Sequence, residues 1–319
     1  MAFVGIDLGG TQLRVAVAND RGRITTVVRE ATEAAKGKQH VIDRIIAAVA
    51  RALEEDRTAA RQVRTLAMGM PGPLDPATGV VIHPVNLPGF RNVPLNRILT
   101  RRTGIRSYIH HDAHMAALGE YRRGAARGAN DLVYMTVSTG IGAGIMLRGE
   151  LYAGAHGIAG EIGHIVVQRN GPRCICGNDG CVEAIASGTG ITRAVREQAP
   201  HTPSSSLHRI ENPTAEDVTR AARTGDTLAL SILENAGAYL GVALGTLINL
   251  LNPELIVLGG SVLKSGPPLL RPMRASMIAS SWRSSRRGLR IVRPALGGDA
   301  GLIGAVEYAR LRARDARSS

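Results

Sequence analysis

Residues 3–18 read FVGIDLGGTQLRVAVA, and this stretch decides how the rest of the chain is interpreted. "FVGIDL" is an apolar run, and "LRVAVAN" alternates between apolar and polar residues. "NDRG" (19–22) is a turn, and "RITTVVRE" alternates again. Such alternation is typical of half-buried strands, and clustered Gly, Asn and Asp are typical of turns. The sequence therefore predicts that the chain opens as antiparallel β structure around a glycine turn.

The same pattern returns in the second half as "DLVYMTVSTGIGAGIML" (131–147), a strand, a Gly-Thr-rich turn and another strand. Helical periodicity is clear over 41–55, with Ile42, Ile45, Ile46, Val49, Ala50 and Leu53 on one stripe. A buried strand is predicted at 63–70, another strand at 106–112, and a buried strand that runs into a Gly-Gly turn at 255–262. Helices are predicted at 113–124, 231–252 and 300–314. We therefore expect an α/β fold of two domains with a cleft between them, residues 1–110 plus 298–319 and residues 111–297.

The composition suits a cytoplasmic protein. The longest apolar segment, 228–251, is interrupted by Glu234, Asn235 and Asn249, and the N-terminus lacks the basic region of a signal peptide. The net charge of +13 is almost all arginine, concentrated in 271–294 and 309–319. Two interpretations are nucleic-acid or membrane-surface binding and solvated helix faces. The second is favoured, since no aromatic residues are interleaved and no DNA-binding motif is present. We expect neither nucleic acid nor membrane as a partner.

Three glycine turns each follow a strand and offer backbone N–H groups to phosphates. "DLGGT" adds a carboxylate suited to the Mg²⁺ side of a nucleotide, "STGIGAG" adds hydroxyls, and "LGGS" is a third turn. Each alone is equally compatible with an ordinary hairpin turn. None is a P-loop or a dinucleotide fingerprint. Together they predict a nucleotide site with the candidates Asp7, Gly9, Gly10, Thr11, Arg14, Ser138, Thr139, Gly140, Gly142, Gly259 and Gly260.

All three cysteines lie in "CICGNDGC" (174–181). An odd number of cysteines in a cytoplasmic chain disfavours disulfides, the main alternative. Zn²⁺ in a structural site takes four ligands, and His164 lies ten residues before Cys174. The pattern predicts a structural zinc site of His164, Cys174, Cys176 and Cys181.

The order of "DLGGT", "GMPGPLD", "STGIGAG", "GAHGIAGEIGH", "CICGNDGCVE" and "VLGG" resembles the ROK family of bacterial sugar kinases and repressors, from residue 5 to about 307. The segment "GEIGH" followed by CxCGxxGCxE is the most specific part. The resemblance implies the actin-like, ribonuclease H-like ATPase fold, with sugar and ATP between two domains. The strand that leads into "DLGGT" begins at residue 3, which leaves no room for the helix-turn-helix segment that precedes this motif in the repressors. We therefore expect the kinase branch.

The resemblance also implies roles for single residues. Asp112 is the base that accepts the proton of the sugar 6-hydroxyl, although a lone Asp at a helix start is otherwise interpreted as an N-cap. Glu161, His164 and Glu183 contact the other hydroxyls, and Gly72 and Asn86 line the same pocket. His164 would bind zinc through one ring nitrogen and sugar through the other. A homodimer or homotetramer is implied as well.

The chain departs from the family around the base. The family commonly shows N-D-A-N, whereas residues 111–114 read "HDAH". His111 then takes the place of an asparagine that contacts the sugar, so the identity of the hexose stays open. A metal site of His110, His111 and His114 is the alternative, disfavoured because Asp112 has a role and no H-E-x-x-H context is present.

The expected activity is ATP-dependent phosphorylation of a hexose, with glucose as the leading substrate. N-acetylmannosamine, N-acetylglucosamine, allose and fructose are alternatives. Polyphosphate is an alternative donor, and a sugar-sensing regulator without catalysis is an alternative function.

Overall fold

The computed structural model describes residues 1–58, 60–84 and 86–318, which divide into two compact units. Unit 1 comprises Met1–Asn130, Gly144–Gly160 and Pro294–Ser319, and unit 2 comprises Asp131–Ala143 and Glu161–Arg293. Residues 111–130, expected in the second domain, pack within unit 1 because helix α3 (Asp112–Arg123) lies against helix α9 (Ala300–Ser318). The units describe packing, and the functional domain boundaries stay a prediction.

Unit 1 is built on a five-stranded sheet of order β3-β2-β1-β4-β8. Its strands are β1 (Ala2–Leu8), β2 (Gln12–Asn19), β3 (Ile24–Ala31), β4 (Val63–Met70) and β8 (Ser107–His111). The first three strands pair antiparallel, which confirms the predicted opening of the chain. β1, β4 and β8 run parallel, so their carboxyl ends meet at one edge of the sheet. In parallel sheets this edge is where ligands bind.

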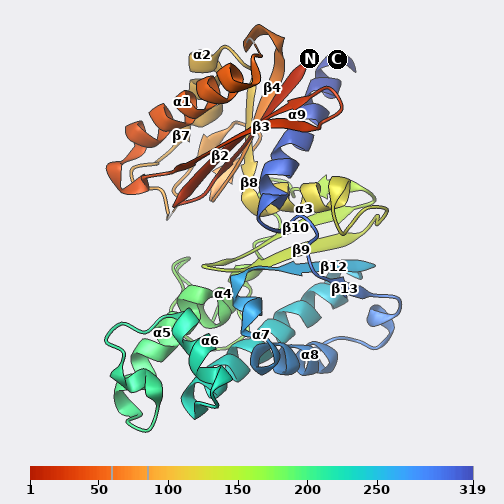
Figure 1. Ribbon diagram of the computed structural model, residues 1–319. Helices are drawn as coiled ribbons and strands as arrows, with labels where there is room; N and C mark the ends of the chain where they lie inside the picture. Colours follow the sequence, from red (N-terminus) through yellow and green to blue (C-terminus); the bar gives the residue numbers. More distant parts are fainter. Residues whose placement is uncertain (59, 85, 319) are drawn as a thin grey trace. The chain divides into compact units, whose positions relative to one another are not determined.

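Helices cover both faces of this sheet (Figure 1). Helix α1 (Lys38–Asp56) and helix α2 (Leu95–Thr103) contribute to the main hydrophobic core with alternate residues of β1 and β4. On the opposite face α9 packs Leu302, Val306 and Ala309 against small residues of the sheet. The approach is close, since a Cβ on Gly5 of β1 would lie 2.6 Å from Val306 Cγ2. One residue of the expected α1 stripe is wrong: Ala50 is exposed, and Ala48 and Ala52 are buried in its place.

Short elements complete unit 1. A three-stranded antiparallel sheet follows β4, and 3-10 turns precede α1, β4 and α9. These elements are β5 (Leu74–Asp75), β6 (Val80–Val81), β7 (Val93–Pro94), η1 (Ala34–Lys36), η2 (Ala60–Gln62) and η8 (Gly297–Asp299).

Unit 2 is centred on strands of a second sheet, of order β11-β10-β9-β12-β13, in which β9, β12 and β13 run parallel. β10 runs on into unit 1, where it pairs antiparallel with β11. The strands are β9 (Leu132–Val137), β10 (Ile141–Leu147), β11 (Glu150–Tyr152), β12 (Leu255–Gly259) and β13 (Arg290–Val292). The helices are α4 (Val182–Ala186), α5 (Gly188–Gln198), α6 (Ala215–Arg223), α7 (Thr227–Leu251) and α8 (Pro267–Ser280). The 3-10 turns are η3 (Ile162–His164), η4 (Ala199–His201), η5 (Ser206–Arg209), η6 (Ser261–Ser265) and η7 (Ser284–Arg286).

Helix α7 is the predicted long helix, and it packs along α8. Its length and composition would suffice to cross a membrane, yet 61% of its most apolar window is buried inside the fold. A Cβ on Gly237 would lie 2.2 Å from the Leu269 carbonyl oxygen of α8. The helix is thus packed as a core helix of unit 2.

Candidate functional site

Asp7 lies near the end of β1, and Arg14 on the neighbouring strand holds its carboxylate. The two residues are cross-strand partners, and Arg14 Nη2 donates to Asp7 Oδ2. Arg14 Nη1 donates to the Gly298 carbonyl and, at 3.1 Å, to Asp299 Oδ1. Burial raises the pKa of Asp7, and the negative charges of Asp112 and Asp299 raise it further. The positive charge of Arg14 lowers the pKa and so partly offsets these effects. Arg14, expected to face phosphates, is thus held between two carboxylates.

The first glycine turn is braced by the backbone around it. Gly9 N–H donates to the Gln12 carbonyl at 2.8 Å, and Thr32 Oγ1 donates to the Gly9 carbonyl at 2.6 Å. Thr11 is exposed at the tip of the turn. A Cβ on Gly10 would lie 3.2 Å from Asn86 Cβ, so Asn86, expected to line the sugar pocket, lies beside this turn. The absence of a side chain at Gly10 therefore lets Asn86 lie close to the backbone of this turn.

Asp112 is the first residue of α3 and follows β8 directly. The N-cap position belongs to His111, whose side chain makes no capping bond, so the N-cap interpretation of Asp112 does not apply. Asp112 Oδ1 accepts the Ala113 N–H at 2.7 Å. Desolvation by the surrounding protein raises the pKa of the Asp112 carboxyl, while two backbone N–H bonds oppose it. The side chain is nevertheless exposed, which limits this desolvation and leaves the carboxylate accessible to a substrate hydroxyl.

Three histidines next to Asp112 in the sequence, His110, His111 and His114, form a buried cluster. The rings of His110 and His114 lie 4.9 Å apart, and those of His111 and His114 lie 5.3 Å apart. His114 Nε2 lies 2.5 Å from the Ala159 carbonyl oxygen. His111 packs against Gly72, where a Cβ would lie 2.2 Å from its Cε1. His111 Nε2 is buried without a hydrogen-bond partner.

Burial keeps these imidazoles neutral. It is the main cause that lowers the pKa of His110, His111 and His114, with a further contribution from neighbouring rings at His110 and His114. The pKa of His114 falls to about 4. A neutral imidazole presents one donor and one acceptor, as an asparagine side chain does, so His111 keeps both functions at neutral pH.

We predict that acidification from pH 7 to 5.5 destabilises the fold through this cluster. The unfolded imidazoles take up protons near pH 6.5, whereas the buried ones do not, so the unfolded state binds more protons in this window. Stability is therefore complete above pH 6.5 and is lost as pH falls towards about 4. His114 alone should cost about 1 kcal/mol by pH 5.5.

Urea unfolding at a series of pH values measures this loss. His114→Gln should flatten the pH dependence, and His83→Gln, at an exposed position, should leave it unchanged. An identical slope in His114→Gln and the unsubstituted protein would contradict the assignment.

In unit 2 the second and third glycine turns lie side by side. Ser138 Oγ and Ser261 Oγ are 3.1 Å apart, although they are far apart in sequence. Gly260 has φ +110°, and a Cβ there would lie 2.1 Å from the Val137 carbonyl oxygen, so only glycine is accommodated. The Thr139 carbonyl accepts a hydrogen bond from the Thr189 N–H at 3.2 Å, and the Thr139 side chain is exposed. The remaining candidates, Gly142 and Gly259, are parts of strands β10 and β12.

Glu183 is tied to the second glycine turn. Its Oε2 accepts the Ile141 N–H at 2.8 Å, and a Cβ on Gly140 would lie 2.7 Å from the same oxygen. Glu183 therefore keeps Oε1 for another contact, and its position depends on Gly140. Glu161 is exposed, with Oε2 3.7 Å from His164 Nε2. Glu161 and His164 thus lie together, as the expected sugar contacts require.

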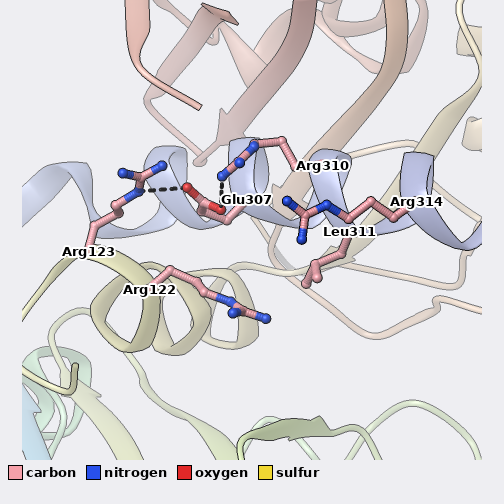
Figure 2. A pocket seen from close by; sticks show the side chains of 6 residues that line it. All are labelled: Arg122, Arg123, Glu307, Arg310, Leu311 and Arg314. Carbon is pink, nitrogen blue, oxygen red and sulfur yellow. Dashed lines mark hydrogen bonds and ion pairs between the residues drawn. The ribbon is translucent and has the colours of Figure 1, made fainter. Parts of the chain in front are cut away.

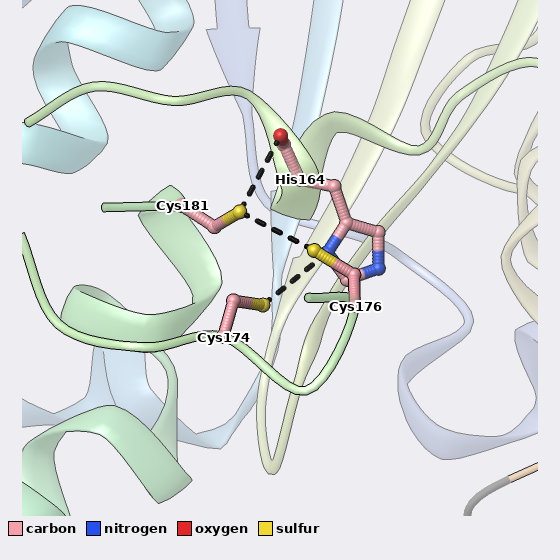
Figure 3. A group of neighbouring side chains, drawn as sticks. All are labelled: His164, Cys174, Cys176 and Cys181. Atoms are coloured by element: carbon pink, nitrogen blue, oxygen red, sulfur yellow. Dashed lines mark hydrogen bonds between the residues drawn. The ribbon is translucent and has the colours of Figure 1, made fainter. Parts of the chain in front are cut away.

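The three cysteines and His164 converge on one point (Figure 3). Their ligand atoms all lie within 4.8 Å of one another. Cys174 Sγ is 3.6 Å from His164 Nδ1, and Cys176 Sγ is 3.6 Å from Cys181 Sγ. Zn–S bonds of about 2.3 Å and Zn–N bonds of about 2.0 Å in a tetrahedron separate the ligand atoms by about 3.5–3.8 Å. The donor set and its spacing fit Zn²⁺, and within residues 1–58, 60–84 and 86–318 no second cluster of this kind is found, the three histidines included.

We expect one zinc per chain in freshly purified protein, measured by elemental analysis. Cys181→Ser should lose this zinc and lower Tm by roughly 5–10 °C, because binding of a structural metal is coupled to folding. Asp179→Asn, an exposed neighbour outside the ligand set, should keep both the zinc and the Tm. Metal-free protein with an unchanged Tm would rule the site out.

Two residues that contact the predicted site were missed in the sequence. Asp299 holds Arg14, and Ser261 meets Ser138. Both follow a Gly-Gly pair, at 297–298 and 259–260. The polar residue after each Gly-Gly pair could have been noticed in the sequence. The residue that it contacts lies more than a hundred positions away, so the contact itself can be seen only in the folded structure.

Known proteins show the same organisation over the whole chain. The model of the ROK family matches residues 3–311. The glucokinase of Thermotoga maritima is 34% identical over 98% of each chain, and that of Halalkalibacterium halodurans is 36% identical over 95% of this chain and 93% of the other. A ROK family glucokinase from Streptomyces griseus, solved in complex with glucose and AMPPNP, superposes with a TM-score of 0.79 at 32% identity, covering 98% of this chain and 100% of that one. This protein belongs to the ROK family and has its actin-like α/β fold.

Proposed function

We propose that this protein transfers the terminal phosphoryl group of ATP to the 6-hydroxyl of a hexose, with glucose as substrate. The observation that carries the proposal is the solvent-open carboxylate of Asp112 at the sheet edge where β1, β4 and β8 end. Asp7 lies at the same edge, close enough for Asp112 to raise its pKa. The glucokinase relatives, one of them holding glucose and an ATP analogue, support the same activity.

Phosphoryl transfer needs a positioned hydroxyl, a base for its proton and charge neutralisation at the phosphates. Asp112 supplies the base. Its Oδ1 is occupied by the Ala113 N–H, which orients the carboxylate and leaves Oδ2 to accept the proton. A raised pKa strengthens the carboxylate as a base, which favours proton transfer late in the reaction.

The glycine turns supply phosphate contacts. Backbone N–H groups of these turns are donors for phosphate oxygens. In unit 1 they belong to Gly9, Gly10 and Thr11, and in unit 2 to Ser138, Thr139 and Gly140. Mg²⁺ prefers oxygen ligands, and the carboxylate of Asp7 is the group that would coordinate it here. When bound, Mg²⁺ neutralises charge on the transferred phosphates. We favour ATP over polyphosphate because the Streptomyces griseus glucokinase was solved with an ATP analogue.

The sugar hydroxyls are assigned to Glu161, His164 and Glu183. The zinc site supports these unit 2 residues, because it fixes His164 at one end of the loop and Cys181, just before α4, at the other. In unit 1, His111 and Gly72 are further candidate contacts of the sugar. A buried imidazole at position 111 in place of the usual asparagine keeps other hexoses as alternatives to glucose.

The assembly and location follow from the family alone. We propose a cytoplasmic enzyme that forms a homodimer or homotetramer.

A panel of hexoses assayed with ATP, alongside Asp112→Asn, tests the function. We expect glucose 6-phosphate formation by the unsubstituted protein, and a loss of kcat of about a hundredfold or more in the variant, because the base is removed. KM for glucose should change little. Asp20→Asn, in an exposed turn, is the matched control. Normal turnover by Asp112→Asn would exclude this base, and inactivity with every hexose would favour a sugar-sensing regulator.

Asp299→Asn is expected to raise KM for Mg–ATP by about threefold to tenfold, with a smaller effect on kcat. Asp299 positions Arg14, and without it the guanidinium would keep only Asp7 and the Gly298 carbonyl as partners. Asp299→Glu should recover part of the loss. Asp43→Asn, which breaks the exposed pair with Arg102, is the control and should behave normally. An unchanged KM in Asp299→Asn would show that Arg14 needs no such support.

A further inference from the structure

A basic cavity of about 220 Å³ lies between the C-terminal end of α3 and the middle of α9 (Figure 2). Arg122 and Arg123 line it from α3, and Glu307, Arg310, Leu311 and Arg314 line it from α9. The whole lining belongs to unit 1. No role in sugar or nucleotide binding was assigned to any of these residues.

The lining carries four guanidinium groups and one carboxylate, which leaves an excess of three positive charges. The carboxylate of Glu307 is buried and already shared. Arg123 Nε donates to its Oε1 at 2.7 Å, and Arg310 Nη1 donates to its Oε2 at 2.7 Å. The net positive charge of the lining attracts anions.

Arg123 and Arg310 are held in place by Glu307, whereas Arg122 and Arg314 are exposed. Arg123 Nη2 also donates to the Arg21 carbonyl at 2.7 Å. The turn between β2 and β3 packs against Arg123 and Arg310. A Cβ on Gly22 of this turn would lie 2.7 Å from Arg310 Nη1 and 2.9 Å from Arg123 Nη2. Arg122 rests over the Tyr121 ring, 5.2 Å from its centroid. Donors fixed in advance bind an anion at a lower entropic cost.

We propose that this cavity binds a multiply charged oxyanion of the phosphate class. Guanidinium groups match such anions, because their planar N–H donors bond pairs of oxygens. The cavity is smaller than the roughly 300–1,000 Å³ of sites for drug-sized ligands, which suits inorganic phosphate or a short phosphate chain. A nucleic acid is the less suitable occupant, since the lining residues include no aromatic side chain for base stacking.

This site is separate from the proposed catalytic residues. Asp112 begins α3 and Arg122 lies ten residues later, which at about 1.5 Å per residue places their backbones about 15 Å apart along the helix. The proposal does not depend on the kinase activity.

Isothermal titration with inorganic tripolyphosphate tests the site. The full chain is titrated at about 0.15 M salt without Mg²⁺, which would chelate tripolyphosphate, and without nucleotide, whose phosphates would compete for the cavity. We expect one tripolyphosphate per chain to bind in this cavity, with the affinity of that site reduced about tenfold or more in Arg122→Gln/Arg314→Gln. Arg122→Lys/Arg314→Lys should give an intermediate affinity, because charge remains but the planar donors are lost.

Arg61→Gln/Arg209→Gln is the matched control. It removes the same charge from two exposed positions outside the cavity and should bind as the unsubstituted protein does. Thermal unfolding of each variant checks that the fold is intact. No binding by the unsubstituted protein, or equal losses in the two glutamine double variants, would overturn the proposal. A preference for single-stranded oligonucleotide over tripolyphosphate at equal phosphate concentration would also overturn it.

The outcome is independent of the proposed function. Binding of the ATP analogue is measured in a separate titration, and the double variant at 122 and 314 should retain hexose kinase activity. Failure of the ATP analogue to bind would count against the proposed kinase function. The comparison of tripolyphosphate binding by the double variants could still be interpreted.

Discussion

The carboxylate of Asp7 is the constraint around which the active edge of unit 1 is arranged. It points to the sheet face covered by α9, where burial and two further carboxylates disfavour its charge. Arg14 compensates for this, and Arg14 is itself fixed by Gly298 and Asp299 in the turn that precedes α9. The buried carboxylate of Asp7 is thus provided with a counter-ion within the same unit.

The turn before α9 is in turn fixed from a distance. Glu120, fully buried in α3, accepts N–H groups of Ala295 at 3.1 Å and Leu296 at 2.8 Å. These residues follow the point where the chain re-enters unit 1. Glu120 therefore fixes the position of the backbone just before η8. The residues of η8 in turn hold the Arg14 side chain, and Arg14 holds the carboxylate of Asp7. In unit 2 the zinc ligands act comparably: Cys181 precedes α4, and Glu183 in its first turn reaches the backbone of the glycine turn at Ile141.

The sequence was sufficient where periodicity or a local motif carried the information. It predicted the antiparallel opening, the main helices and the cluster of His164 with the cysteines, because each depends on residues close in the chain. It failed where partners are distant. The contacts of Arg14 with Asp7 and Asp299 depend on strand register and on a turn almost three hundred residues later, which no local motif reveals. Helical spacing put Ala50 on the buried stripe, but tertiary packing chose Ala48 and Ala52.

The histidines at 111 and 114 show how a local substitution alters the rest of the pocket. An imidazole is larger than an asparagine amide, and it fits because position 72 has no side chain: a Cβ there would overlap the His111 ring. His114 is accommodated by the Ala159 carbonyl, which lies within hydrogen-bond distance of its Nε2. The packing at this position therefore depends jointly on Gly72, His111 and His114, because changing any one alone disturbs the packing or hydrogen bonding of the cluster.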